Sequence, residues 1–261
     1  METEIKTRIE QVKGKVGFYY KNLSTGETIG YQENEKMMAA SVIKLMILTE
    51  AFRQMEEGLA KADEIFTVHK EDCVPSCGAL TYLHDGIQVT LEDLCVLMII
   101  LSDNTATNLL IDRLGEEKIN ETIRSLGLKV TQLNRKMFDS EKSARGIQNY
   151  ITAYEMGQIL EKMYKGELVS KAASKRMLEI LSDQRLNSKI PFFLHSLMEE
   201  TAVAHKTGED TGITHDVGIV LGEQPFIICF CGNEVDVPHY ERVIADLSLL
   251  IYQSVKGEMM K

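Results

Sequence analysis

Ser41 and Lys44 are separated by two residues in an otherwise apolar stretch, AASVIKLMIL, at positions 39–48. On a helix this spacing places both side chains on one face, about one turn apart. A serine hydroxyl becomes an effective nucleophile when a base takes its proton, and a lysine whose pKa is lowered by burial can be that base. The pair therefore predicts acylation of Ser41. The alternative is a surface serine beside a lysine whose ammonium group reaches solvent.

Two further polar tripeptides carry residue types that assist such chemistry. The first is S-D-N at residues 102–104, and the second is K-T-G at residues 206–208. Each also has a plain structural interpretation: Asp103 or Asn104 could cap the following helix, and K-T-G could be the end of a strand entering a turn. Taken singly, none of the three motifs identifies a function.

The elements that must position these residues change type along the chain. Residues 15–33 predict a β-hairpin, because two β-rich runs flank the turn signal S-T-G. A helix is predicted from Ser41 to Gly58, another from an N-cap at Thr90 to Ser102, and a third from Asn104. The C-terminal part predicts three strands followed by an amphipathic helix, at residues 201–208, 214–222, 225–233 and 239–255.

Strands at both ends of the chain with helices between them predict one antiparallel sheet built from both termini and an inserted helical lobe. The expected fold is therefore α+β, in two lobes of a single catalytic domain, 1–261. The α/β lobe comprises residues 1–38 with 202–261, and the helical lobe comprises residues 39–201. A ligand site is expected in the cleft between two such lobes.

Composition excludes two classes of partner. The formal net charge of −10, with no basic stripe, argues against a nucleic-acid surface. No run approaches the roughly 20 apolar residues of a membrane helix. Cys73 and Cys77 are close in the sequence, but no second cysteine pair completes a zinc-binding pattern, and the other three cysteines are irregularly spaced. The zinc-binding motif H-E-x-x-H is also absent from the sequence. Neither a metal nor a cofactor is predicted, and the expected partner is a small-molecule substrate.

The predicted location is the cytoplasm. The N-terminus is charged and lacks the apolar centre of a signal peptide. The odd number of cysteines, five, fits a reduced protein better than a disulfide framework. A secreted protein whose signal peptide had been removed would give the same picture.

The three motifs together resemble a known signature. S-x-x-K, then S-D-N, then K-T-G, in this order, is typical of class A β-lactamases and penicillin-binding proteins. Residues 83–115 resemble the helix–loop–helix segment of the class A enzymes, and residues 204–220 are similar to their strand–turn–strand segment. The sequence thus most resembles the class A β-lactamase-related serine hydrolases. The two-lobed fold that this implies agrees with the one predicted above.

Chemistry and resemblance together suggest the roles of the helical-lobe residues. Ser41 would attack a strained or activated carbonyl and become acylated. Lys44 would act as the base or proton relay. Ser102 would pass a proton to the leaving nitrogen, and Asn104 would hold Lys44 and offer its amide to the substrate.

The remaining roles fall on the K-T-G segment and the residue after it. Lys206 and Thr207 would bind a substrate carboxylate. Gly208 would leave room for substrate along the strand edge. The backbone N–H groups of Ser41 and Glu209 would form the oxyanion hole.

Residues 133–156 depart from the pattern that they otherwise resemble. In class A enzymes an arginine here is followed two residues later by a glutamate that activates the deacylating water, whereas Arg135 is followed by Met137. A thioether cannot accept a proton from water at neutral pH. Asp139 and Glu141 could replace the glutamate, but solvated loop charges are the favoured interpretation.

Two other departures concern the shape of the site. Asn149 stands where those enzymes usually carry an aspartate paired with the loop arginine. Pro75, Ser76 and Cys77 stand where they usually place an aromatic residue at the mouth of the cleft. The loop is therefore expected to be held differently, and the range of substrates is expected to differ.

The leading prediction is a serine hydrolase of the class A β-lactamase type that acts on a β-lactam or a related amide bearing a carboxylate, with slow deacylation. The alternatives are a D-alanyl-D-alanine peptidase or penicillin-binding-type acyltransferase, a cytoplasmic amidase or esterase, and a catalytically dead binding module. A fluorescent penicillin distinguishes active forms from dead ones. Turnover of a chromogenic cephalosporin distinguishes a hydrolase from an acyl trap.

Overall fold

The computed structural model of the chain describes residues 1–75, 77–197 and 203–257. The chain divides into two compact units. The first comprises Met1–Val42, Ile151–Glu161 and Leu186–Lys261, and the second comprises Ile43–Tyr150 and Lys162–Arg185. These bounds differ from those of the predicted lobes, because residues 151–161 and the segment from residue 186 onward belong with the sheet.

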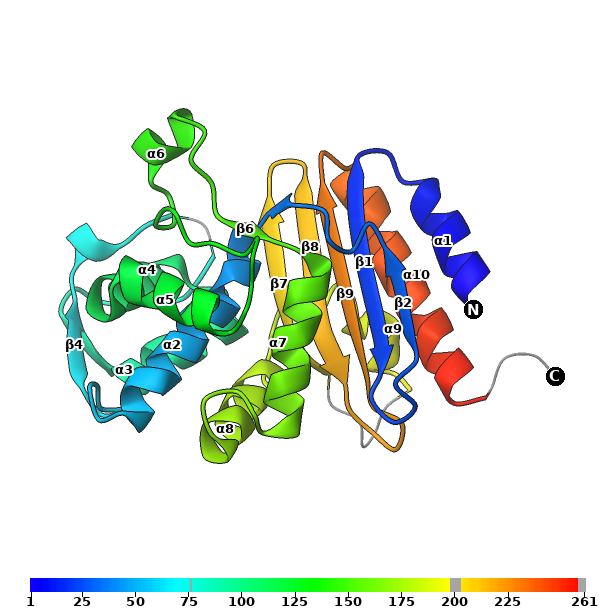
Figure 1. Ribbon diagram of the computed structural model, residues 1–261. Coiled ribbons are helices and arrows are strands. Elements are labelled where there is room, and N and C mark those ends of the chain that lie inside the picture. Colours follow the sequence, from blue (N-terminus) through cyan, green and yellow to red (C-terminus); the bar gives the residue numbers. More distant parts are fainter. Residues whose placement is uncertain (76, 198–202, 258–261) are drawn as a thin grey trace. The chain divides into compact units, whose positions relative to one another are not determined.

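The first unit is built on a five-stranded antiparallel sheet with strand order β2-β1-β9-β8-β7 (Figure 1). Its strands are β1 Lys15–Asn22, β2 Thr28–Tyr31, β7 Val203–Asp210, β8 Ile213–Val220 and β9 Phe226–Asn233. The prediction of a sheet formed by both ends of the chain is confirmed, as is the β1–β2 hairpin. Residues 201 and 202, which begin the first predicted C-terminal strand, lie outside the described residues. The strand β7, which carries the K-T-G motif, is at the edge of the sheet.

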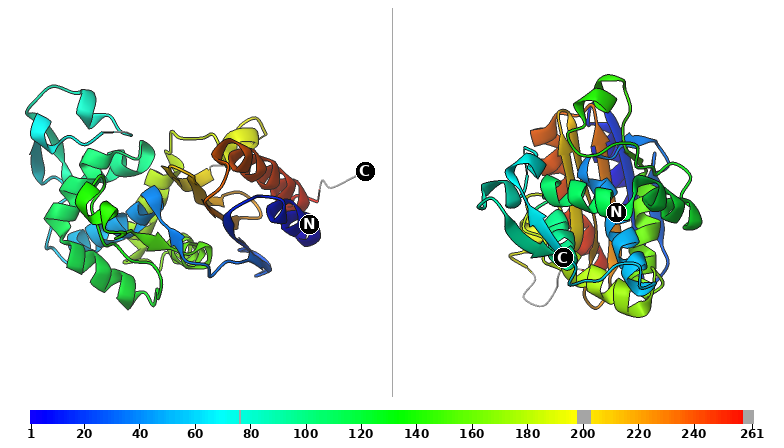
Figure 2. Two further views of the ribbon diagram at one scale, coloured as in Figure 1. Left: turned by 90° about the horizontal axis from the view of Figure 1, so that it is seen from above. Right: turned by 90° about the vertical axis from the view of Figure 1, so that its left-hand side faces the viewer.

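Side chains alternate between the two faces of this sheet. Phe18 and Tyr20 of β1 belong to a core shared with the helices α1 Glu2–Glu10, α9 Pro191–Leu194 and α10 Val237–Val255 (Figures 1 and 2). Tyr19, between them, faces the other way and contacts Tyr154 of α7 Ala153–Lys165, with ring centroids 5.3 Å apart. Both faces of the sheet are therefore covered by helices.

The second unit is organised around α2 Lys44–Glu56, which packs against four other helices of the unit, α3, α4, α5 and α8. The helices and strands that it contributes besides α2 are α3 Leu91–Ile100, α4 Asn104–Leu114, α5 Glu116–Ser125, α6 Ser140–Ala144, α8 Lys171–Ser182, β4 Ile65–Val68 and β5 Ile87–Thr90. Two further short strands are β3 Met37–Met38 and β6 Tyr150–Ile151.

Local signals set the helix ends that matter for the site. Thr90 caps α3 as predicted, since its hydroxyl accepts from the Asp93 N–H while the Asp93 carboxylate accepts from the Thr90 N–H. Asp103 caps α4 by accepting from the Ala106 N–H at 3.0 Å. Ser102 therefore lies on the short connection between α3 and α4, as predicted. Among the described residues, no helix combines the length and the apolar composition that a membrane span requires.

Candidate active site

Ser41 lies in a short 3₁₀ turn, η1 Ala40–Ile43, and Lys44 is the first residue of the α-helix that follows. The prediction that both belong to one α-helix is therefore wrong in detail. Ala40, directly before Ser41, has a φ of 41°, which is in the left-handed region. The chain turns sharply at this point and presents Ser41 at the start of the helical stretch, one turn before Lys44.

The segment that leads to Ser41 is fixed to the sheet through Met38. The Met38 N–H donates to Asn233 Oδ1 at 2.7 Å, and the Met38 carbonyl accepts from His215 Nε2 at 2.8 Å. His215 Nδ1 in turn accepts from the Gly232 N–H at 3.0 Å. The imidazole is therefore neutral, with its proton on Nε2. Only two residues separate Met38 from Ser41, which this clamp helps to position.

His215 makes the stability of this region depend on pH. Burial lowers the pKa of His215 to about 4, and the nearby charge of Lys189 acts in the same direction. Between pH 6.5 and 4, His215 is protonated in the unfolded chain but remains neutral in the folded protein. The free energy of unfolding is therefore expected to decrease by about 3 kcal/mol as the pH is lowered from 6.5 to 4. Urea unfolding at several pH values measures this slope. His215→Gln should flatten it, whereas substitution of the exposed His239 should not.

A buried cluster around Lys44 forms the part of the site that the second unit supplies. Lys44 is fully buried, and its Nζ donates to the Ser102 carbonyl at 2.8 Å, to Ser102 Oγ at 3.0 Å and to Asn104 Oδ1 at 2.8 Å. Three acceptors match the three N–H groups of an ammonium ion. The structure thus brings Lys44 into contact with Ser102 and Asn104, which lie 58 and 60 residues after it in the sequence.

The backbone at Ser102 is strained, with a φ of 53°. It is held by the carboxylate of Asp103, whose Oδ2 accepts from the N–H groups of Ala79 at 2.7 Å and Leu80 at 2.9 Å. Gly78 is required beside this carboxylate, because a Cβ at residue 78 would lie 2.3 Å from the Asp103 Cγ. Asp103, which the sequence suggested only as a cap, therefore also fixes the segment that precedes α3.

That preceding segment also reaches Asn104. The Asn104 N–H donates to the Cys77 carbonyl at 3.2 Å, and Asn104 Nδ2 donates to the Pro75 carbonyl at 3.4 Å. Residue 76, between them, is outside the described residues. Pro75 and Cys77, two of the positions predicted to replace an aromatic residue, thus contact the asparagine that holds Lys44.

The K-T-G motif lies in the interior of β7, which continues to Asp210, so the prediction of a strand end at Gly208 is wrong. Lys206 is fully buried and its Nζ donates to the Thr207 carbonyl at 2.8 Å. At Gly208 a Cβ would lie 3.0 Å from Val42 Cγ2 and 3.3 Å from the Ala39 carbonyl oxygen. A side chain there would press on the turn that carries Ser41, and glycine lets the strand and the turn approach closely.

The face of β7 that carries His205, Thr207 and Glu209 is bonded to a segment that the sequence did not single out. His205 bonds Asp216 Oδ1 at 2.8 Å and Asn187 Oδ1 at 3.0 Å. The buried Lys189 donates to Glu209 Oε1 at 2.5 Å. These isolated residues carry no motif, and their partners lie on other elements, so sequence spacing gives no signal for them.

The loop after Leu133 is held differently from the family pattern, as predicted. Arg135 donates to Gln148 Oε1 from Nε at 3.0 Å and from Nη2 at 2.8 Å. The Asn149 side chain bonds the backbone of the loop: Oδ1 accepts from the N–H groups of Asn134 and Arg135, and Nδ2 donates to the Arg135 carbonyl. An amide–backbone clamp and an arginine–glutamine pair thus close this loop.

Met137 is fixed close to the cluster around Lys44. Its N–H donates to Asn108 Oδ1 at 2.8 Å, and Asn108 Nδ2 donates to its carbonyl at 3.0 Å. Asn108 lies four residues after Asn104 on α4, on the same helix face. Asp139 is engaged as the N-cap of α6, with Oδ1 accepting from the Lys142 N–H.

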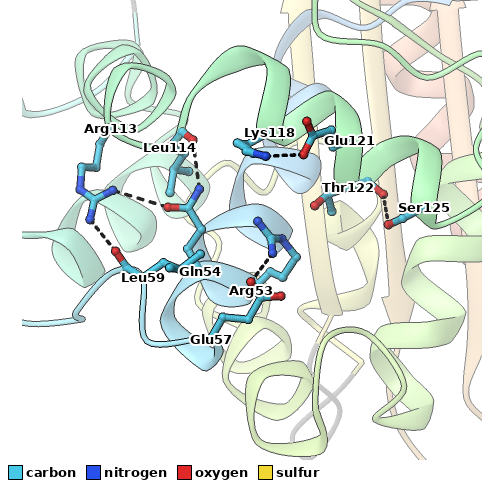
Figure 3. A pocket seen from close by; sticks show the side chains of 10 residues that line it. All are labelled: Arg53, Gln54, Glu57, Leu59, Arg113, Leu114, Lys118, Glu121, Thr122 and Ser125. Atoms are coloured by element: carbon cyan, nitrogen blue, oxygen red, sulfur yellow. Dashed lines mark hydrogen bonds and ion pairs between the residues drawn. The ribbon is translucent and has the colours of Figure 1, made fainter.

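A separate pocket of about 650 Å³ opens on the second unit (Figure 3). Its lining residues are Arg53, Gln54, Glu57, Leu59, Arg113, Leu114, Lys118, Glu121, Thr122 and Ser125. The cations are engaged by carboxylates: Arg53 by Glu50 and Glu57, Arg113 by Glu64, and Lys118 by Glu121. The pocket contains none of the residues of the three motifs.

In residues 1–75, 77–197 and 203–257 no group of three or more His, Cys, Asp or Glu side chains could hold a metal ion.

Comparison with known proteins identifies the family. The profile of the Beta-lactamase enzyme family, Beta-lactamase2, matches residues 1–255. A β-lactamase of Stenotrophomonas maltophilia is 27% identical over 69% of the chain, and one of Rhodobacter capsulatus is 28% identical over 68%. The matched segments span about three fifths of these relatives, 60% and 61% of their length.

Solved structures give the same result for the fold. A β-lactamase of Sphaerobacter thermophilus has a TM-score of 0.91 and 27% identity, covering 100% of both chains. PBP-A has a TM-score of 0.87 and 26% identity, covering 98% of this chain and 96% of the other. The chain has the fold of the serine β-lactamases, and it belongs to the Beta-lactamase enzyme family.

Proposed function

We propose that the protein is a serine hydrolase of the class A β-lactamase type that forms an acyl-enzyme at Ser41 and releases it slowly. The main support is the cluster in which the buried Lys44 bonds Ser102 and Asn104, one turn after Ser41 in the chain. A buried ammonium with three well-placed acceptors is costly to assemble and suits a group that must exchange a proton. Membership of the family makes β-lactams the substrate class to test first.

The cluster suggests a route for the proton. Lys44, once deprotonated, would take the proton from Ser41 as its Oγ attacks the carbonyl carbon of the amide. Ser102 Oγ, 3.0 Å from Lys44 Nζ, can both accept and donate a proton. It would deliver a proton to the nitrogen as the C–N bond breaks, leaving the acyl group on Ser41. Family membership supports placing the β7 residues beside this centre, with the N–H groups of Ser41 and Glu209 toward the oxyanion.

The substrate carboxylate is assigned to Lys206 and Thr207. Lys206→Ala is expected to slow acylation by benzylpenicillin more than acylation by its methyl ester, by about 1.5–3 kcal/mol for a lost charge-assisted hydrogen bond. Stopped-flow rate constants for the two compounds measure the difference. Lys206→Met, which keeps most of the buried stem, is the matched control for packing. Equal losses with both compounds would place carboxylate recognition on other residues.

Slow release is inferred from Met137, which stands, by the resemblance of its loop to that of the class A enzymes, in place of their general base and cannot act as one. This favours a second candidate function, that of a penicillin-binding-type acyltransferase or peptidase working through the same residues. Among the structural neighbours, a variant of PBP-A was solved as an acyl-enzyme complex with penicillin G, at 27% identity to this chain. Both candidates share the acylation step and differ in how the acyl group leaves Ser41.

One experiment tests the proposal and distinguishes the candidates. Intact-mass spectrometry after mixing with benzylpenicillin should reveal one adduct per chain, and peptide mapping should place it on Ser41. Turnover of a chromogenic cephalosporin, monitored over hours, then measures release. Absence of any adduct, without turnover, would contradict the acyl-enzyme proposal. Rapid turnover without an accumulating adduct would contradict slow release.

A further inference from the structure

Lys189 is a fully buried lysine that holds two carboxylates at one face of β7. Its Nζ donates to Glu209 Oε1 at 2.5 Å and lies 3.4 Å from Glu241 Oε1. Glu241 is supported by a hydrogen bond from Thr214 Oγ1 at 3.0 Å. A buried ammonium group needs a negatively charged partner, and one carboxylate would neutralise its charge. Lys189 has two carboxylate partners.

The two carboxylates are not equally fixed. The Glu241 side chain is 26% exposed and carries the additional bond from Thr214, whereas the Glu209 side chain is 49% exposed. Glu209 can therefore leave Lys189 by rotating into solvent, and Glu241 would remain as the partner of the lysine. The buried cation would then face outward at the position that Glu209 vacates.

That position adjoins the proposed carboxylate site. Thr207 and Glu209 are two residues apart on β7, so their side chains share one face of the strand. Their partners on β8, Asp216 and Thr214, confirm the register. A substrate carboxylate bound at Thr207 would lie beside the carboxylate of Glu209, and like charges at such separations repel.

We propose, resting on the proposed function, that Glu209 is a specificity-determining residue. The Glu209 carboxylate binds Lys189 at the position where a substrate carboxylate could otherwise bind this lysine. An anionic substrate therefore binds well only after it has displaced the Glu209 carboxylate from Lys189. Glu209 consequently reduces the advantage that Lys206 and Thr207 give to anionic acyl donors over neutral ones. Lys189 is the second cation that becomes available to a substrate carboxylate when Glu209 moves away.

The test compares two acyl donors that differ only in this charge, benzylpenicillin and its methyl ester. Glu209→Gln keeps the backbone N–H and the length of the side chain but removes its charge. The ratio of the acylation rate constants, penicillin over ester, is expected to rise about tenfold, the scale of a half-exposed charge pair. Glu234→Gln, which removes an exposed carboxylate bound to Lys15 in the same unit, is the control for net charge.

Adding Lys189→Met to Glu209→Gln tests the cation. The gain in the ratio should disappear in the double variant, provided that thermal melting shows it to be folded. The proposal would be overturned if Glu209→Gln left the ratio of the acylation rate constants unchanged, or if Glu234→Gln raised it equally. If the gain in the ratio persisted in the double variant, the role proposed for Lys189 would be refuted. If neither compound acylates the unmodified protein, the proposed function has failed instead.

Discussion

Ser41→Ala is expected to abolish covalent labelling by benzylpenicillin, from one adduct per chain to none. The acyl bond forms on the serine oxygen, and alanine has no atom that can replace it. The turn that presents this oxygen is fixed through Met38 by His215 and Asn233, which the substitution does not touch. The variant should therefore keep its fold and its thermal stability. Intact-mass spectrometry and a thermal melt measure both on the same sample.

Ser102→Ala is the matched control, because it removes the same hydroxyl group from the other serine of the site. It should slow labelling without abolishing it, since Ser41 remains and Lys44 keeps its bonds to the Ser102 carbonyl and Asn104. Full labelling of Ser41→Ala on another residue would end the serine-hydrolase interpretation. Peptide mapping has to check Cys77 in particular, because this residue is exposed and its backbone carbonyl bonds the Asn104 N–H.

The parts of the site that could be predicted from the sequence are those encoded by short local patterns. S-x-x-K, S-D-N and K-T-G each join residues within a few positions, and their order pointed to the family. Short runs rich in apolar residues, linked by turns, likewise predicted β8 and β9, in which every residue is buried. The helix cap at Thr90 followed from residue type, whereas residue type left the cap of α4 open between Asp103 and Asn104.

The parts that could not be predicted depend on contacts between distant residues. The bond between His215 and Met38 joins positions 177 residues apart, and neither residue type suggests the other. Lys189 gives no signal until the fold brings it to Glu209. The helix α1 was missed because a charged stretch with only Ile5 and Ile9 buried has a weak apolar pattern.

Met137→Glu is expected to accelerate release of the acyl group by about 10²–10⁴-fold, the usual contribution of a general base. The backbone of residue 137 is clamped in both directions by Asn108, one turn after Asn104 on α4. A carboxylate there would belong to a loop that is tied to α4, the helix that carries Asn104, rather than to a free loop. The rate of adduct loss after removal of excess penicillin, monitored by mass spectrometry, measures the effect.

Met137→Gln is the control that decides the cause of any gain. Glutamine matches the shape of glutamate and is polar, but it has an amide N–H2 donor in place of one carboxylate oxygen and no basic oxygen at neutral pH. It should therefore leave release as slow as in the unmodified protein. Equal acceleration by both variants would mean that polarity or better water access, and not proton abstraction, limits release. No acceleration by glutamate would mean that the clamp at Asn108 points the side chain away from Ser41. Asp139 is a weak replacement base because capping of α6 occupies its carboxylate, and the exposed Glu141 would then be the next residue to mutate.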